Sequence, residues 1–217
     1  MPHNPYYDEN GNELPSVTQI IKLLNHKGLI EWANYIGMRH ISYNDYMEEK
    51  QVIGSLVHLR IEKFLNDEEQ PASFIDQDIE NEVSKKFELF KGWYDETQAK
   101  PIWVEKALVN NRYGGTLDAL VQIKNGTIGL IDFKTSKKVK PSQLLQLGGY
   151  LNLIEEKEPE MYDKIDFCSI IAFGKELNIS SRLKEDMMLY RNAFEKLYML
   201  YCSWKSILKD EWHQSIE

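Results

Sequence analysis

Charged side chains interrupt two neighbouring apolar segments near the middle of the sequence. Asp118 lies in the first segment, and Asp132 and Lys134 lie in the second, on either side of Phe133. Burying such groups costs several kcal/mol each unless they are paired or bind a metal. Two carboxylates beside one lysine therefore predict a site for a divalent cation.

The pattern of apolar residues predicts that these side chains lie on strands. Three short strands are expected at residues 102–109, 115–123 and 127–135, where short apolar runs are bounded by turn residues. Residues two apart on a strand share a face, so Asp132 and Lys134 point the same way. The three segments predict an antiparallel meander.

The turn between the last two strands decides whether Asp118 joins that face. A two-residue turn at Asn125-Gly126 would separate the charged groups. A three-residue loop with Gly126 left-handed would instead pair Ile123 with Thr127. The resulting partners are Asp118 with Asp132, Leu117 with Phe133, and Ala119 with Ile131. We predict this second register, because it gathers the polar groups on one face.

Glu105, on the preceding strand, is a third candidate oxygen ligand. A four-residue loop at 110–113 would place it opposite Asp118, where its carboxylate can reach the same cation. An exposed strand glutamate without a special role is the alternative.

Helical periodicity surrounds the predicted strands. Helices are expected at residues 14–25, 29–40, 44–66, 76–98 and 141–156, followed by a buried strand at 165–173 and a long helix from about 183 to 209. This order predicts an α/β sandwich in one domain spanning residues 1–217. The domain divides into an N-terminal helical part (1–50), a catalytic core (51–175) and a C-terminal helix (181–212), whose apolar stripe we expect to cover the sheet.

Bulk properties exclude several classes of protein. The hydrophobic content of 42% suits a folded domain rather than a disordered chain. No run of roughly 18 apolar residues would span a membrane, and no signal pattern opens the sequence, so a cytoplasmic location is expected. Cys168 and Cys202 are too few for an iron–sulfur cluster held by four cysteines, and both are expected to be buried.

A short basic segment follows the charged strand. Lys137, Lys138 and Lys140 come soon after Lys134 with no acidic residue between them. Exposed charges act over about 8 Å at physiological salt, so these lysines can attract phosphate although the formal net charge of the chain is −8. A solvated loop is the alternative, but adjacency to Asp132 favours a DNA-binding patch.

The order of the motifs resembles that of the PD-(D/E)XK nucleases, in particular the RecB-like branch that includes phage recombination exonucleases. The resemblance covers about residues 54–173. It consists of four motifs: G-x-x-x-H at 54–58, G-x-x-D at 115–118, D-x-K at 132–134 and Q-x-x-x-Y at 146–150. It implies a restriction-endonuclease-like core of helix, three-stranded antiparallel meander, helix and strand.

The resemblance also implies roles for particular residues. A Mg²⁺ or Mn²⁺ ion would be held by His58, Asp118, Asp132 and the backbone carbonyl of Phe133. The catalytic set would comprise Asp118, Asp132, Lys134, Glu105, Gln146 and Tyr150, with Lys134 orienting the attacking water. The expected DNA contacts are Lys137, Lys138, Lys140 and Gln143, the last on the same helix face as Gln146.

Together these expectations describe a metal-dependent deoxyribonuclease, an exonuclease of phage-like recombination or repair. DNA would be its partner, a recombination protein could be a second, and an oligomer would be compatible with processive digestion. No iron–sulfur cluster and no membrane attachment are expected. The alternative is an inactive nuclease-like module that binds DNA or a protein without cutting. The presence of every catalytic position favours the enzyme.

Overall fold

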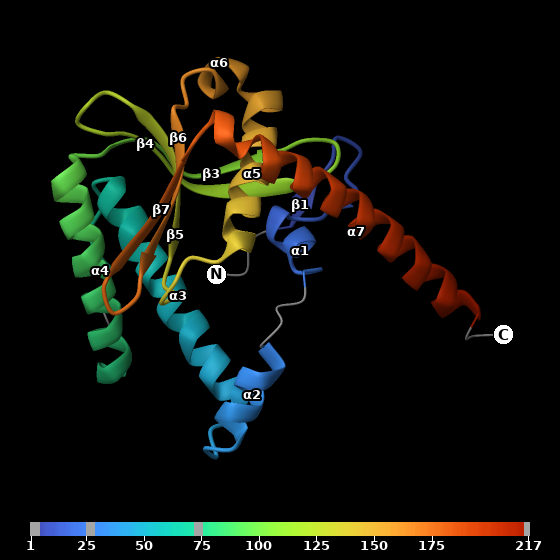
Figure 1. Ribbon diagram of the computed structural model, residues 1–217, viewed down its shortest axis with the longest axis horizontal. Helices are drawn as coiled ribbons and strands as arrows, with labels where there is room; N and C mark the ends of the chain where they lie inside the picture. Colours follow the sequence, from blue (N-terminus) through green and yellow to red (C-terminus); the bar gives the residue numbers. More distant parts are fainter. Residues whose placement is uncertain (1–4, 25–28, 72–75, 215–217) are drawn as a thin grey trace.

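A computed structural model describes residues 5–24, 29–71 and 76–214. Its centre is a five-stranded sheet in the order β3-β4-β5-β6-β7 (Figure 1). The strands are β3 (Lys100–Val109), β4 (Gly114–Gln122), β5 (Ile128–Lys134), β6 (Phe167–Phe173) and β7 (Leu177–Leu183). β5 and β6 run parallel, and each other neighbouring pair in this sheet is antiparallel. The α/β class and the β3-β4-β5 meander agree with the sequence prediction.

Two long helices cover one face of the sheet. α3 (Tyr43–Leu65) begins after Ser42 and α4 (Gln77–Thr97) after Asp76, and each of these preceding residues accepts a backbone N–H of the first turn. The helices and the sheet bury a shared apolar core that includes Ile53, Val57, Ile61, Val83, Phe90, Ala119, Ile131, Phe133 and Phe173. These helices match the expected ranges 44–66 and 76–98 because their apolar residues recur every three or four positions.

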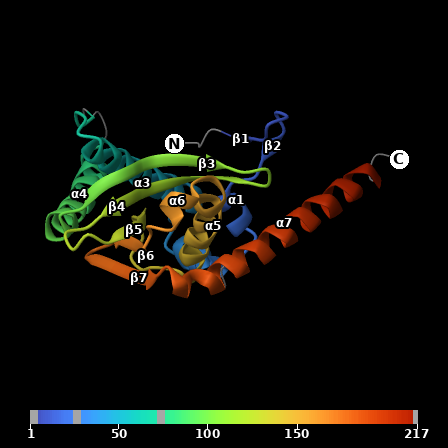
Figure 2. The same cartoon turned by 90° about the horizontal axis from the view of Figure 1, so that it is seen from above.

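The opposite face is covered by α5 (Pro141–Lys157), with α1 (Val17–Ile21) and the first part of α7 (Met188–Gln214) packed around it (Figures 1 and 2). α5 and the short helix α6 (Pro159–Tyr162) connect the parallel strands β5 and β6. Figure 2 shows that α7 then leaves the body of the protein. The stripe on α7 therefore covers the core at Phe194 and Leu197, whereas Trp204 is 48% exposed.

Gly148 allows α5 and α7 to approach closely. A Cβ at this position would lie 2.8 Å from the backbone carbonyl oxygen of Tyr190, which cannot move without shifting α7. We expect Gly148→Ala to lower the free energy of unfolding by about 1–3 kcal/mol or more. Gly92→Ala in α4 is the matched control, because nothing lies within 4 Å of its Cβ position. That change should stabilise by about 0.5–1 kcal/mol, and urea unfolding of both variants checks the opposite signs.

The N-terminal elements are short. β1 (Tyr6–Tyr7) and β2 (Glu13–Leu14) form a separate two-stranded sheet before α1, and α2 (Leu29–Gly37) precedes α3. Ser16 caps α1 reciprocally with Gln19, and the Gly114 N–H donates to the carbonyl of Pro15 at 3.0 Å. The latter bond attaches the N-terminal segment to β4, beside the candidate site.

Several boundary predictions are wrong. The expected start of the final helix at Leu183 lies in β7, an edge strand that pairs with β6, and a 3-10 turn (Glu185–Met187) precedes α7. The predicted helix 14–25 is shorter, since Leu14 belongs to β2 and α1 ends at Ile21, while Asn25 lies outside the described residues. β1, β2 and α6 were not expected. Short polar elements such as these depend on tertiary contacts rather than on periodicity.

Two further observations concern bulk properties. Cys168 is buried as predicted, but Cys202 is exposed, because it lies on the part of α7 that leaves the body. Within the described ranges, no helix combines the length and apolarity needed to cross a bilayer.

Candidate metal-binding and catalytic site

The register of β4 and β5 follows the predicted three-residue loop. Ala119 pairs with Ile131, the Ile123 N–H donates to the Thr127 carbonyl at 2.9 Å, and Gly126 has φ +90°. This is the pairing that directs Asp118 toward Asp132. The third position of this loop needs a positive φ, which glycine adopts readily, so Gly126 was a signal for this loop and for its register.

Backbone pairing between β4 and β5 stops just before the charged residues. The last backbone pair of the ladder is Ala119 with Ile131. The next link between the strands is made by a side chain, because Asp118 Oδ2 accepts the Phe133 N–H at 2.7 Å. The predicted Leu117–Phe133 contact is wrong, because the strands separate here and the two side chains lie in the cores on opposite faces of the sheet. The N–H and C=O groups of one strand residue point toward the same adjacent strand, so the Phe133 carbonyl is also directed toward β4.

Glu105 occupies an unusual place on β3. Its neighbours Val104 and Lys106 pair with Ala119 and Leu117, which sets Glu105 opposite Asp118 as the four-residue loop predicted. Its φ is +46°, a left-handed conformation that costs about 1–3 kcal/mol for such a residue. Backbone strain of this kind is found where surrounding structure holds a side chain in place for function.

His58, Glu105 and Asp118 bring donor atoms together from a helix and two strands. One ligand atom of each lies within 4.8 Å of the others, and His58 Nδ1 is 3.8 Å from Asp118 Oδ2. Hard cations bind oxygen at about 2.0–2.6 Å, so donors up to roughly twice that distance apart can share one ion. Gly54, one turn before His58, lies beside Thr135, since a Cβ at this position would be 3.4 Å from Thr135 Oγ1.

Asp132 is the most buried acid of the site, and Lys134 is its ion-pair partner. Asp132 is 0% exposed, and Lys134 Nζ lies 2.6 Å from its Oδ2. Neither Asp132 oxygen has a well-oriented hydrogen bond within the described residues, so the ion pair is a close contact that leaves Oδ1 without a partner. A fully buried carboxylate oxygen without a partner fits a cation ligand and is otherwise costly.

Burial and the closeness of the acids raise the pKa values of Glu105 and Asp132. Burial, followed by repulsion from Asp118, Glu62 and Asp132, raises the pKa of Glu105 to about 8. Burial also raises the pKa of Asp132 to about 7, although Lys134 opposes the rise. Burial alone would lower the pKa of Lys134, but the nearby carboxylates raise it overall, so this lysine stays charged. An added dication would relieve the repulsion among the acids.

These raised pKa values predict how the stability of the metal-free protein depends on pH. The ordinary values of Glu105 and Asp132 are 4.5 and 3.8, so the folded protein holds protons that unfolding releases at intermediate pH. Raising the pH from about 5 to about 8 should therefore lower the Tm measured in EDTA. Each pKa unit corresponds to about 1.4 kcal/mol, and each kcal/mol to about 2–4 °C in a chain of this size.

Glu105→Gln tests that dependence directly. The variant should lose much of the fall in Tm and should exceed the wild type in stability at the alkaline end. Glu96→Gln, at an exposed position on α4, serves as the control and should follow the wild type. Equal pH slopes for the wild type and Glu105→Gln would contradict the assignment of Glu105 as a strained, crowded acid.

A cleft of about 710 Å³ opens above these residues. His58, Glu105, Asp118 and Lys134 line it, and α5 contributes Gln146 and Tyr150. Gln146 Nε2 donates to Tyr150 Oη at 2.8 Å, and Gly115 makes room for that ring, since a Cβ there would lie 2.6 Å from Tyr150 Cε1. The cleft therefore unites the charged strand residues with the Q-x-x-x-Y motif.

Glu62 and Tyr6 are among the cleft residues to which the sequence analysis assigned no role. Glu62 follows His58 by one helical turn, a spacing that already places both on one face of α3. Tyr6 reaches the cleft from the N-terminal segment, and its Oη lies 2.8 Å from Thr116 Oγ1. Nothing in the local sequence around Tyr6 indicates this position, because it depends on the docking of β1 against Gly114.

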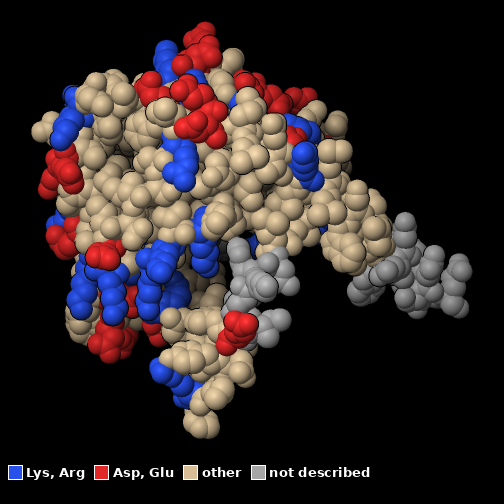
Figure 3. Space-filling view, viewed as in Figure 1, with Lys and Arg blue, Asp and Glu red and all other residues tan. Residues whose placement is uncertain are grey.

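The expected DNA contacts lie at the end of the sheet. Lys137, Lys138 and Lys140 are exposed on the segment between β5 and α5. Figure 3 shows lysine and arginine side chains gathered at this end of the molecule. Gln143 is used differently, since its side-chain oxygen accepts the Lys140 N–H at 2.7 Å and so caps α5. The basic segment is thus surface-exposed and begins two residues after Thr135.

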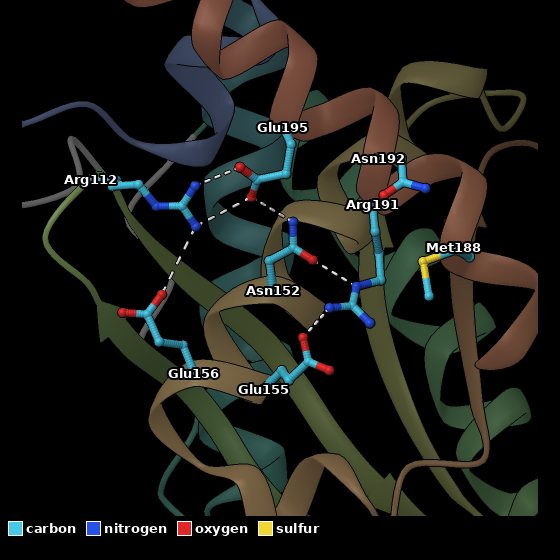
Figure 4. Close-up of a pocket in the computed structure, with 8 residues that line it drawn as sticks. All are labelled: Arg112, Asn152, Glu155, Glu156, Met188, Arg191, Asn192 and Glu195. Carbon is cyan, nitrogen blue, oxygen red and sulfur yellow. Dashed lines mark hydrogen bonds and ion pairs between the residues drawn. The ribbon is translucent and has the colours of Figure 1, made fainter.

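A second cavity of about 450 Å³ lies between α5 and α7 (Figure 4). Its arginines are already paired: Arg112 with Glu195 at 2.5 Å, and Arg191 with Glu155 and with Asn152 at 2.6 Å. It shares no lining residue with the cleft. Its charges are therefore satisfied within the protein, and we assign it no chemical role.

Comparison with known proteins gives distant structural similarities. No family model and no curated protein matches the chain. An alkaline exonuclease from Laribacter hongkongensis, LHK-Exo, is similar at TM-score 0.40 and 10% identity over 91% of this chain and 94% of that chain. The structure of LHK-Exo in complex with dAMP is similar at TM-score 0.36 and 13% identity, over 72% of this chain and 85% of that chain. The structure of SSO0001 is similar at TM-score 0.33 and 16% identity, over 70% of this chain and 74% of that chain. All three similarities are distant, and the residue assignments rest on this chain's own geometry.

Proposed function

We propose that this protein is a metal-dependent DNA nuclease that hydrolyses phosphodiester bonds. The observation that carries the proposal is the cluster of His58, Glu105 and Asp118 donor atoms within 4.8 Å, beside the buried Asp132–Lys134 pair in an open cleft. A nitrogen and several carboxylate oxygens are suitable ligands for Mg²⁺ or Mn²⁺. Uncompensated acids of this density are difficult to explain as a structural feature.

The ligands of the proposed ion come from four structural elements, α3, β3, β4 and β5. We assign His58, Asp118, Asp132 and the Phe133 carbonyl to it, and add Glu105 because its donor atom lies within the same cluster. When bound, a divalent cation supplies Lewis-acid polarisation of the scissile phosphate and lowers the pKa of coordinated water. The partnerless Oδ1 of Asp132 and the crowding around Glu105 support this fit.

The other cleft residues act on the substrate. Lys134 carries a positive charge at the edge of the carboxylate cluster, where its ammonium can orient the attacking water and stabilise charge on the phosphate. Gln146 and Tyr150 present an amide and a phenol whose hydrogen bond fixes both side chains. Tyr150 remains protonated, because burial raises its pKa well above the ordinary value, and so serves as a donor rather than a base.

We further propose an exonuclease that acts in phage-like recombination or repair, with DNA as its partner. This part rests on the motif order, which is that of the RecB-like branch, and on the exposed lysines of the segment between β5 and α5. A recombination partner protein and an oligomer belong to the same proposal. The exposed part of α7 offers apolar surface for such an assembly, and light scattering of the purified protein tests it.

Digestion of end-labelled linear DNA and of covalently closed circular DNA, with Mg²⁺ or with EDTA, tests the function. We expect Mg²⁺-dependent release of label from linear DNA and no cutting of the circle. Cutting of the circle would identify an endonuclease. Absence of cleavage on single- and double-stranded DNA in both Mg²⁺ and Mn²⁺ would contradict the nuclease proposal and favour a binding module.

A further inference from the structure

A buried lysine on α4 lies at the end of the sheet that carries the proposed site. Lys86 is 7% exposed, and its buried neighbours on α4 are apolar, among them Val83 and Phe90. A lysine in such surroundings is costly unless its ammonium hydrogens are all used. The sequence shows no reason for a lysine at this position, because the apolar stripe of α4 continues on either side of it.

The ammonium of Lys86 makes two hydrogen bonds and one ion pair. Nζ donates to the carbonyl oxygens of Phe173 at 2.8 Å and Thr135 at 3.2 Å, and lies 3.6 Å from Glu82 Oε1. The two carbonyls and the carboxylate together compensate the buried charge. Glu82 is fixed in turn by Lys50 of α3, at 3.0 Å. A chain of charges therefore leads from α3 through α4 to the sheet.

The two carbonyls belong to the ends of the parallel strands. The last residue pair of the β5–β6 ladder is Lys134 with Ala172, and Thr135 and Phe173 are the next residues of each strand. Lys86 therefore bridges the ends of β5 and β6, at the point where the backbone pairing of the two strands stops. Thr135 is also covalently joined to Lys134, so this bridge fixes the backbone that carries the proposed catalytic lysine.

A close backbone contact holds the following residues in the same place. A Cβ at Gly174 would lie 2.9 Å from the Cα of Lys137, so only glycine lets the lysine segment rest against the end of β6. Lys86 and Gly174 thus act on the two ends of a short stretch, at Thr135 and at Lys137. The exposed side chains of Lys137 and Lys138 project from this fixed backbone.

We infer that Lys86 is a positioning residue: its ammonium fixes the backbone after Lys134 so that Lys137 and Lys138 are presented to nucleic acid. The inference rests on the proposed function for its consequence, but the clamp itself is a property of the fold. It differs from a general stabilising role, because its effect on DNA binding must pass through the two exposed lysines.

Hydrogen exchange tests the clamp without DNA. Lys86→Met keeps the length and apolar stem of the side chain and removes the three donors. Peptides covering residues 132–140 and 171–176 should exchange faster in this variant, while the rest of the sheet is little changed. Val83→Ala, a fully buried apolar truncation one turn earlier on α4, is the control for general destabilisation. Equal local exchange in both variants, or no increase in Lys86→Met, would overturn the inference.

A double-mutant cycle tests the consequence for binding. Affinity for a short fluorescein-labelled duplex is measured in EDTA for the wild type, Lys86→Met, Lys137→Ala with Lys138→Ala, and the triple variant. Lys86→Met should weaken binding about tenfold in the wild-type background and less than about twofold without the two lysines. Equal effects in both backgrounds would show that Lys86 does not act through them. If the wild type binds no DNA, the proposed function fails, and the exchange measurement still decides the clamp.

Discussion

Lys134→Ala is expected to lower the rate of DNA cleavage about 10²–10⁴-fold, while DNA affinity in EDTA changes little. Lys134 Nζ contacts Asp132, and the charges of Asp118 and Glu105 also act on it, so its ammonium is held beside the proposed metal ligands. Loss of a contact that acts mainly in the transition state lowers turnover more than it lowers substrate affinity. Single-turnover cleavage with enzyme in excess measures the chemical step.

The Lys134→Ala protein should still fold. Asp132 would lose its ion-pair partner, but its pKa is already raised to about 7 by burial, so it can take up a proton instead of remaining a buried, unpaired anion. Lys124→Ala is the matched control, since Lys124 lies in the same hairpin and donates to the exposed Glu96 carbonyl. Comparable losses in the two variants, or full activity of Lys134→Ala, would remove Lys134 from the proposed machinery.

Asp118→Asn is expected to abolish both cleavage and stabilisation by metal. In the wild type, Mg²⁺ or Mn²⁺ should raise the Tm, because a ligand that binds the folded state at 100 times its Kd adds about 2.7 kcal/mol. Asp118 contributes to the donor cluster and also accepts the Phe133 N–H at 2.7 Å. Asparagine retains that acceptor but removes the charge, so the strands stay together while cation affinity is lost. Calorimetric titration and thermal melts measure the two effects.

Asp166→Asn provides a close control for this variant. Asp166 accepts the Ile128 N–H at 2.7 Å at the other end of β5, so it performs the same structural task outside the cleft. Its replacement should leave metal-dependent stabilisation and cleavage unchanged. A normal metal response in Asp118→Asn would refute Asp118 as a ligand. A lost response in both variants would point to a general effect on the sheet.

The proposed cleavage site and the proposed DNA-binding lysines should respond differently to salt. The proposed catalytic groups lie in a partly enclosed cleft, whereas Lys137, Lys138 and Lys140 are exposed on the segment that follows β5. Affinity that depends on exposed lysines falls with ionic strength, because the counterions that binding releases from DNA enter a more concentrated solution. Residues of the two kinds can therefore be distinguished in one series of titrations.

Local sequence determined more of this site than is usual for a fold with long-range strand pairing. The loop at 124–126 specified the register, because a left-handed third residue requires glycine, and this directed Asp118 toward Asp132. The four-residue loop at 110–113 likewise placed Glu105 opposite Asp118. Apolar periodicity located α3, α4 and α5, since one face of each helix is buried along most of its length.

Only the tertiary structure decided the features that depend on contacts between distant segments. The local sequence does not indicate three such features: the separation of β4 and β5 beyond Ala119, the left-handed backbone at Glu105, and the position of Tyr6 in the cleft. The same holds for Lys86, whose acceptors lie 49 and 87 residues away. Hydrophobic pattern and turn chemistry act between near neighbours and so are readable from the chain. The backbone strain at Glu105, the interstrand contacts of Lys86 and the cleft depend on segments that are far apart in the chain.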